Sequence, residues 1–232
     1  MVITGDAGHA LVGAVGARGN GLKEEVEARK VLKRLGEMLI EHGHQFKDCK
    51  CDNEYNKDKQ LERIVTEANK YKADLFLSIH LNSYKNSEAN GVETFSLSTS
   101  GKGNEYAKNI QNELVKTIGW TNRGKKEANF YVLRKTSAPA VLVELGFITN
   151  KSDMNKFDVE KIAKAIFKAI TGTNYIESKP SAQTPTTNKN NIYRIFVDGD
   201  QQGTAYADHK NILGMVEAAL KNNVGIIEIK QK

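Results

Sequence analysis

Two histidines and one glutamate stand at or near the ends of apolar segments, where their side chains are available for chemistry. His9 follows "MVITGDAG", His80 follows the nearly apolar "DLFLSI", and Glu144 lies inside "APAVLVELGF". In open α/β sheets, functional groups collect beyond the carboxyl ends of the strands. A lone histidine at a strand end is more commonly a hydrogen-bonded bystander. Three such groups in one chain, however, predict a shared site at one sheet edge.

A fourth group of this kind opens the first expected helix. The stretch "GNGLKEE" places Glu24 and Glu25 in its first turn. A carboxylate there also stabilises the positive end of the helix dipole, which is sufficient reason for either residue. The helix follows the loop that leaves His9, so its N-terminus is expected on the same rim of the sheet.

Two imidazoles and one carboxylate are a ligand set that suits zinc. Three protein ligands leave the fourth tetrahedral position open to water, which is the pattern of catalytic sites. A nearby carboxylate that is not a ligand can then act as general acid and base. Glu144 suits that role. An unpaired charge in an apolar segment costs free energy, so a glutamate there is expected to have a function. The alternative is a buried Glu144 paired with a Lys or Arg.

These groups are positioned by strands that alternate with helices. Apolar patterning predicts strands over residues 1–6, 44–49, 74–80, 91–98 and 138–147, and helices over 21–43, 59–72, 104–118 and 158–172. Such alternation predicts an α/β fold with a mostly parallel, twisted central sheet flanked by helices. This first domain spans residues 1–172.

The chain changes character after residue 172. Residues 173–190 are polar, contain Pro180 and Pro185, and are expected to form a linker. Residues 191–232 predict a small α+β domain of ββαβ type. It has strands around a turn at Asp198-Gly199, a helix and a last strand; the helix turns Ile212, Met215, Val216 and Leu220 inward.

Composition limits the partners of the protein. The 232 residues carry a net charge of +6, and about five of these charges fall in residues 1–170. The excess favours a polyanionic partner such as an anionic cell wall, although a solvated mixed surface explains it equally simply. No apolar run approaches the length of a membrane span, and the N-terminus has no signal-peptide pattern.

Cys49 and Cys51 are too close for a C-x-x-C site and are expected to be reduced thiols without a role in the chemistry.

Four blocks of the sequence, in order, resemble the zinc-dependent N-acetylmuramoyl-L-alanine amidases of the amidase-3 type. They are "GDAGHA", "GAVGARGNGLKEE", "SIHLNS" and "RGKKEANFYVLRKTSAPAVLVELGFITN". The resemblance covers about residues 1–171. The "GDAGHA" form and the lysine-rich composition look most like the endolysins and autolysins of clostridia and their phages.

The resemblance implies the roles of the site residues. His9, Glu24 and His80 would be the zinc ligands and Glu144 the catalytic acid and base. Glu25 departs from the family, which usually has Lys there, so the doubled acid leaves two candidates for the third ligand. Asn82 and Arg123 fall in the family's motif blocks near the cleft and are expected to contact substrate.

The reaction implied by the resemblance is hydrolysis of the amide between N-acetylmuramic acid and L-alanine in bacterial peptidoglycan. The C-terminal domain would bind wall polymers or form a homodimer. Without a signal peptide, the protein is expected to be made in the cytoplasm and to act on the wall after release, as a phage endolysin does.

Three alternatives remain at the level of the sequence. A bacterial autolysin would have the same chemistry. A zinc peptidase acting within the stem peptide would share the metal, although the chain has no H-E-x-x-H helix. A non-enzymatic binder of polyanions is supported by charge alone, and no nucleic-acid motif accompanies it.

Overall fold

The computed structural model describes residues 1–177, 192–197, 200–206 and 227–231. It divides the chain into two compact units, Met1–Glu177 and Ser178–Lys232. The first unit contains all the predicted site residues and is described first.

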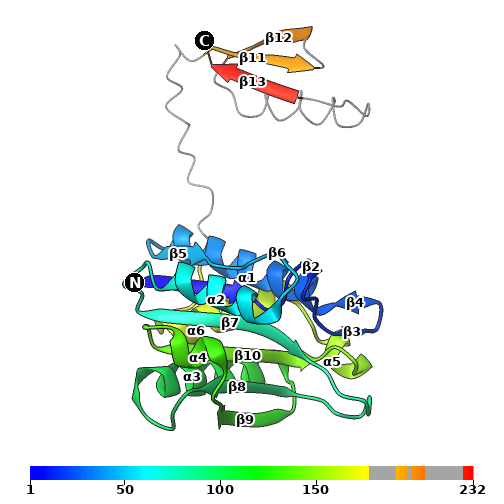
Figure 1. Cartoon of the computed structure of the whole chain (residues 1–232), viewed down its shortest axis with the longest axis vertical. Helices are drawn as coiled ribbons and strands as arrows, with labels where there is room; N and C mark the ends of the chain where they lie inside the picture. The colour runs from blue at the N-terminus through cyan, green and yellow to red at the C-terminus, as the bar shows by residue number, and fades with distance from the viewer. Residues whose placement is uncertain (178–191, 198–199, 207–226, 232) are drawn as a thin grey trace. The chain divides into compact units, whose positions relative to one another are not determined.

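A six-stranded sheet in the order β5-β1-β7-β10-β8-β9 forms the centre of the first unit (Figure 1). The strands are β1 (Val2–Ala7), β5 (Gln45–Asp48), β7 (Leu75–Asn82), β8 (Val92–Ser96), β9 (Asn122–Glu127) and β10 (Ala140–Phe147). Neighbours among β5, β1, β7 and β10 are parallel, whereas β8 runs antiparallel to β10 and β9 parallel to β8. The predicted mostly parallel sheet is confirmed.

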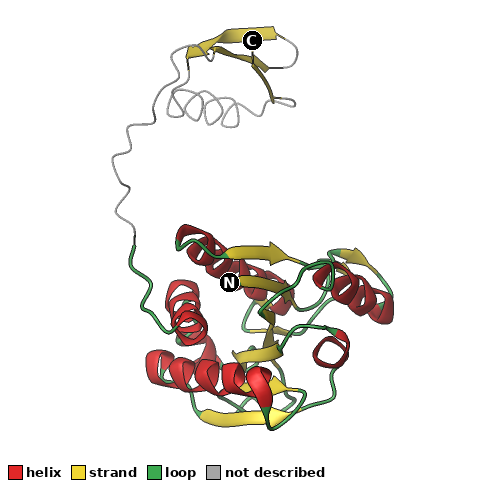
Figure 2. Ribbon diagram, turned by 90° about the vertical axis from the view of Figure 1, so that its left-hand side faces the viewer, coloured by secondary structure: helices red, strands yellow, loops and turns green. Residues whose placement is uncertain are grey.

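Helices cover both faces of this sheet (Figure 2). The larger core joins one face to α1 (Glu24–Glu41), α3 (Gly101–Ile118) and α6 (Val159–Thr171). The smaller core joins the opposite face to α2 (Lys57–Ala68) and α4 (Tyr131–Lys135). A further short helix, α5 (Lys151–Asn155), follows β10.

Side-chain alternation along β7 places its polar residues on one face of the sheet. Leu75, Leu77 and Ile79 belong to the larger core. Phe76 belongs to the smaller core, and Ser78 and His80 continue the same face, because alternate residues of a strand point to the same side. The face under α2 and α4 therefore changes from apolar to polar toward the carboxyl end of the strand.

Four predicted helices and five predicted strands of this unit are confirmed, but seven elements were missed: β9, α4, α5 and four strands of two residues each. Strand β9 has the sequence NRGKKE and pairs only with β8 at the sheet edge, so its exposed positions need no apolar alternation. Helices α4 and α5 have five residues each, too few for a helical period to show. Two small pairs, β2 (Val12–Gly13) with β6 (Asn53–Glu54) and β3 (Arg18–Gly19) with β4 (Leu22–Lys23), order the loops around α1.

The two cysteines lie beyond the end of β5. Both are free; Cys49 is buried in the smaller core, and Cys51 packs against the same core. The predicted strand over residues 44–49 therefore ends one residue earlier, at Asp48, and the expected free thiols follow it.

The second unit contains a three-stranded antiparallel sheet in the order β12-β11-β13. Its strands are β11 (Ile192–Val197), β12 (Asp200–Tyr206) and β13 (Ile227–Gln231). The predicted helix and most of the predicted linker lie outside the described residues. Within the described ranges, no helix has the length and hydropathy needed to cross a membrane.

Candidate metal centre and active-site cleft

His9, Glu24 and His80 meet at the carboxyl edge of the sheet, as the sequence predicted. Each offers a ligand atom within 4.8 Å of the others. Glu24 Oε1 lies 3.2 Å from His9 Nε2 and 3.0 Å from His80 Nδ1. Ligand atoms about 2 Å from a shared zinc ion are separated by distances of this order. The donor set and its geometry therefore fit a divalent cation.

The backbone around these ligands is shaped to bring them together. His9 has a φ of 66°, a left-handed conformation that is unfavourable for a residue with a side chain. A Cβ on Gly8 would lie 2.1 Å from the His80 ring, and one on Gly16 would lie 2.8 Å from Glu24 Oε2. Both positions need glycine, because the ligand side chains occupy the space of a side chain there.

The two neighbouring acids at the start of α1 have different partners. Glu24 Oε1 faces the two imidazoles, and its Oε2 accepts a hydrogen bond of 2.9 Å from the Ala17 N–H. Glu25 is bound by both terminal nitrogens of Arg18, each at 2.7 Å. The bidentate pair directs Glu25 away from the imidazoles, so Glu24 is the acid that completes the three-residue cluster.

The ionisation of the cluster reflects this proximity. Burial alone would raise the pKa of the Glu24 carboxyl, but hydrogen bonds with His80 and His9 lower it well below its usual range. Burial would lower the pKa of His80, yet its hydrogen bond with Glu24 and the nearby acids raise it to about 9. The Glu24 carboxylate thus favours a positive charge beside it. A bound cation would supply that charge in place of a protonated imidazole.

Glu144 lies beside the cluster on the neighbouring strand. It pairs in register with His80, and alternation directs both side chains to the face under α2 and α4. Its Oε2 is sealed from solvent without a hydrogen-bond partner, and it forms no salt bridge with a Lys or Arg of residues 1–177. Burial, with the charges of Glu24 and Glu93, raises the pKa of Glu144 to about 8. The alternative of a paired, structural Glu144 is therefore wrong for this unit.

A cluster of charged residues on β8 and β9 lies on the other side of β10 from the metal ligands. The sequence analysis did not predict this cluster. Glu93 pairs in register with Glu144 and accepts hydrogen bonds from Arg123 Nε at 2.8 Å and Lys126 Nζ at 2.5 Å. Asn82 Nδ2 donates to the other carboxylate oxygen at 2.6 Å. Arg123 and Asn82 therefore meet at Glu93, but neither lines the cleft, and their contact with substrate stays a prediction.

A cleft of about 290 Å³ opens next to the cluster, between the sheet and helices α2 and α4. Asp6, Ser78 and Glu144 lie on its floor with the two histidine ligands, and the walls are mostly apolar. Burial raises the pKa of the Asp6 carboxyl. The sequence analysis missed Asp6 and Ser78. The signal that could have identified Ser78 is its place two residues before His80, on the same strand face.

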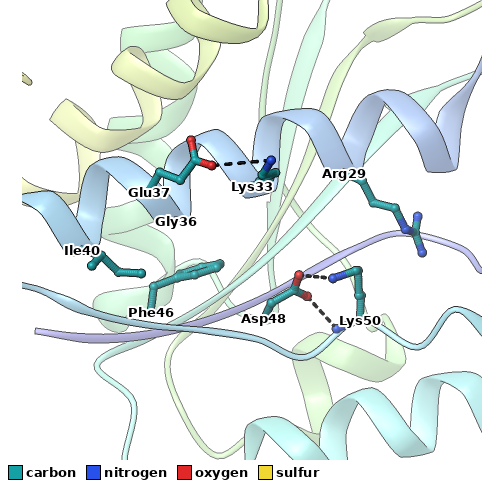
Figure 3. Close-up of a pocket in the computed structure, with 8 residues that line it drawn as sticks. All are labelled: Arg29, Lys33, Gly36, Glu37, Ile40, Phe46, Asp48 and Lys50. Atoms are coloured by element: carbon teal, nitrogen blue, oxygen red, sulfur yellow. Dashed lines mark hydrogen bonds and ion pairs between the residues drawn. The ribbon is translucent and has the colours of Figure 1, made fainter. Parts of the chain in front are cut away.

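A second hollow lies between α1 and β5, away from these groups (Figure 3). Four of its five charged side chains pair with one another, Lys33 with Glu37 at 3.8 Å and Lys50 with Asp48, and the fifth, Arg29, binds Asp52. The Phe46 ring packs against Gly36, where a Cβ would lie 2.5 Å from it. The hollow contains no metal-competent cluster of described residues, so the chemistry belongs to the cleft at the sheet edge.

A metal-competent cluster and an unpaired acid at the carboxyl edge of a mostly parallel sheet define a metal-dependent hydrolase. The chain belongs to the N-acetylmuramoyl-L-alanine amidase family, whose model matches residues 3–172. This match covers the first unit apart from its ends and confirms the resemblance drawn from the four sequence blocks.

Individual relatives agree with the family match. The chain is 38% identical over 167 residues to the uncharacterised protein YqiI of Bacillus subtilis, covering 71% of this chain and 79% of YqiI. It is 36% identical over 155 residues to the amidase LytC of the same organism, covering 66% of this chain but 30% of LytC. The catalytic domain of the CD27L endolysin, which targets Clostridia difficile, superposes with a TM-score of 0.69 at 28% identity, covering 75% of this chain and 98% of that domain.

Proposed function

We propose that the protein hydrolyses the amide between the lactyl group of N-acetylmuramic acid and L-alanine of the peptidoglycan stem peptide, with zinc as cofactor. The observation that carries the proposal is the position of the unpartnered Glu144 carboxyl beside the cluster of His9, Glu24 and His80. Family membership supports the choice of bond.

The residues of the chain have separate tasks in this reaction. His9, Glu24 and His80 would hold the zinc ion, which when bound polarises a carbonyl and makes water acidic. Glu144 accepts the proton of the attacking water and delivers it to the leaving amine. Its Oε2 forms no bond with a described residue that would compete for that proton. The apolar walls of the cleft exclude bulk water and strengthen these electrostatic interactions.

Analysis of the products tests the proposal. Digestion of purified peptidoglycan is expected to release new L-alanine amino termini without new reducing sugar ends, measured by amine labelling and a reducing-sugar assay. A peptidase would leave L-alanine attached to muramic acid in the mass spectrum of the muropeptides. Either that result or new reducing ends would contradict the proposed bond.

We also propose that Arg123 binds a carboxylate of the stem peptide, together with Lys126. One carboxylate, Glu93, is bound by two cations here, so this group carries a net positive charge beside Glu144. The side chains of Arg123 and Lys126 are 36% and 42% exposed, which leaves donors available to substrate. Asn82 donates a hydrogen bond to Glu93 and would therefore affect substrate binding by positioning Glu93 and the two cations that bind it.

Replacing Arg123 by Ala is expected to raise KM by about tenfold, the effect of losing one charge-assisted hydrogen bond, with little change in kcat. The loss should be confined to muramoyl peptides whose second residue has a free α-carboxylate and be absent when that group is amidated. Lys125→Ala is the control, because Lys125 Nζ binds the Ser98 carbonyl oxygen and not Glu93. An equal loss on both substrates would contradict carboxylate binding.

The remaining proposals concern the setting of the reaction. Similarity to the CD27L endolysin domain supports an endolysin, which would be released from the cytoplasm onto the wall. The alternative is a bacterial autolysin, and similarity to the bacterial amidase LytC supports it. The unit Ser178–Lys232 is proposed to bind wall polymers or to form a homodimer.

A further inference from the structure

His9 is the member of the metal-competent cluster that the sheet holds least directly. His80 lies within β7, in register with a residue of β10, and the carboxylate of Glu24 is bound by a backbone N–H. His9 lies two residues beyond the end of β1, in a left-handed conformation. Such a conformation persists only where surrounding contacts determine it. Contacts other than strand pairing therefore hold His9 in place.

Arg29 supplies contacts of this kind. Its side chain leaves α1 and extends to the segment that follows β1 (Figure 3). Nη2 donates a hydrogen bond of 2.7 Å to the His9 carbonyl oxygen. Nη1 lies 3.4 Å from the Gly8 carbonyl oxygen and donates at 2.5 Å to the carbonyl oxygen of Glu25. One planar group therefore ties the backbone of His9 to the helix that begins with Glu24.

Asp52 orients the guanidinium of Arg29. Nε donates a hydrogen bond of 2.9 Å to Asp52 Oδ1, and Nη2 binds the same oxygen. The backbone of Asp52 is held in turn, because its carbonyl oxygen accepts a hydrogen bond of 3.2 Å from the Val12 N–H, next to the β2–β6 pair. The Arg29 side chain is only 12% exposed, so its donors are directed to protein acceptors. A rigid guanidinium suits several acceptors in fixed directions, which a lysine ammonium does not.

We infer that Arg29 is a positioning residue for the metal centre. Its guanidinium, oriented by Asp52, holds the His9 carbonyl so that the imidazole faces Glu24 and His80. Groups that orient a ligand without touching the metal change metal affinity by about 10–100-fold when they are removed. The inference rests on the zinc site of the function proposed above. The competing explanation is an ion pair that stabilises the fold equally with and without metal.

Arg29→Met tests the inference, because methionine keeps an apolar stem but has no donors. Titration of the metal-free protein with zinc against a chromophoric chelator is expected to show an affinity about 10–100-fold below that of the wild type. Zinc should also raise the melting temperature of the variant less than that of the wild type, because stabilisation by a ligand grows with its affinity. An ion pair that only stabilises the fold would lower the metal-free and zinc-loaded melting temperatures equally.

Arg29→Lys is the milder variant, because it keeps a positive charge beside Asp52 and loses only the fork of donors. Its zinc affinity should still fall, by about tenfold. Cobalt(II) in place of zinc reports the geometry of the ligands through its visible absorption. The cobalt spectra of both Arg29 variants are expected to differ from the wild-type spectrum.

Arg34→Met is the matched control. Arg34 also lies on α1 and also binds one carboxylate with two nitrogens, since its Nε and Nη2 lie 2.6 Å and 3.2 Å from the oxygens of Glu160. It has no bond to the His9 segment among the described residues. Arg34→Met should lower the melting temperature but keep the zinc affinity and the cobalt spectrum of the wild type.

The possible outcomes separate this inference from the function on which it rests. Zinc affinities of both Arg29 variants within threefold of the wild type, with unchanged cobalt spectra, would overturn the positioning role alone. A wild-type protein that binds no zinc would overturn the proposed cofactor and this inference with it. A wild-type protein that binds zinc but releases no amine from a muramoyl peptide would overturn the amidase reaction and leave the zinc titrations decisive for Arg29.

Discussion

Replacement of Glu144 by Gln is expected to lower kcat by about 10²–10⁴-fold, the usual contribution of a general acid and base. Glutamine keeps the size of the side chain but can neither accept the proton of the attacking water nor return it to the leaving amine. The folded state should not suffer, because Glu144 Oε2 makes no hydrogen bond that the amide would lose. Single-turnover kinetics on a muramoyl peptide, with zinc content and melting temperature measured on the same preparation, would check this result.

Glu27→Gln is the control for this variant. Glu27 is a buried glutamate on α1, but it pairs with Lys30 and does not line the cleft. It should retain the activity of the wild type. A Glu144→Gln protein with full zinc content that still hydrolyses at a rate within threefold of the wild type would remove Glu144 from the mechanism.

The positions of His9, His80 and Glu144 were predictable because each lies in or just after a strand of the parallel part of the sheet: His80 in β7, Glu144 in β10, and His9 two residues after β1. Parallel strands end at one sheet edge, so residues that close such strands meet in space without any detailed knowledge of packing. The expected start of the first helix added Glu24 and Glu25, and family resemblance selected Glu24. Its choice over Glu25 could not be made from spacing, because consecutive residues of a first helical turn are equally near the rim.

That choice depends instead on a contact between loops. The small β3–β4 pair turns Arg18 toward α1, and the guanidinium binds Glu25 with two nitrogens. Two-residue strands with glycine and charged residues show no hydrophobic period, so the sequence does not reveal this turn. The register of β9 escaped prediction for a similar reason, and with it the joint binding of Glu93 by Arg123 and Lys126.

Asp6 and Ser78 show a different limit. A polar residue within a strand is ordinary in a sequence, and its significance depends on what surrounds it in the fold. Only the structure shows that Asp6 and Ser78 are buried register neighbours that line the cleft. Patterns of residue type thus predict the metal-competent groups better than the other polar groups that line the cleft.

Replacement of Glu24 by Gln is expected to remove the bound metal and, with it, hydrolysis. A neutral amide replaces the one anionic ligand of the cluster, and the cation then faces two imidazoles alone. The loss of zinc affinity should exceed the factor of about 10–100 that follows from changing a residue that only supports a ligand. Competition titration against a chromophoric chelator measures the affinity, and zinc analysis of dialysed protein measures the content.

Glu25→Gln separates the two neighbouring acids in the same assay. Its carboxylate binds Arg18 and the Gly16 N–H, not the imidazoles, so the metal should remain, with affinity reduced by no more than about 10–100-fold. Chelator treatment of the wild type should abolish hydrolysis, and added zinc should restore it. A Glu25→Gln protein that loses zinc while Glu24→Gln retains it would exchange the roles of the two residues. The arrangement at the start of α1 would then differ in the metal-bound protein.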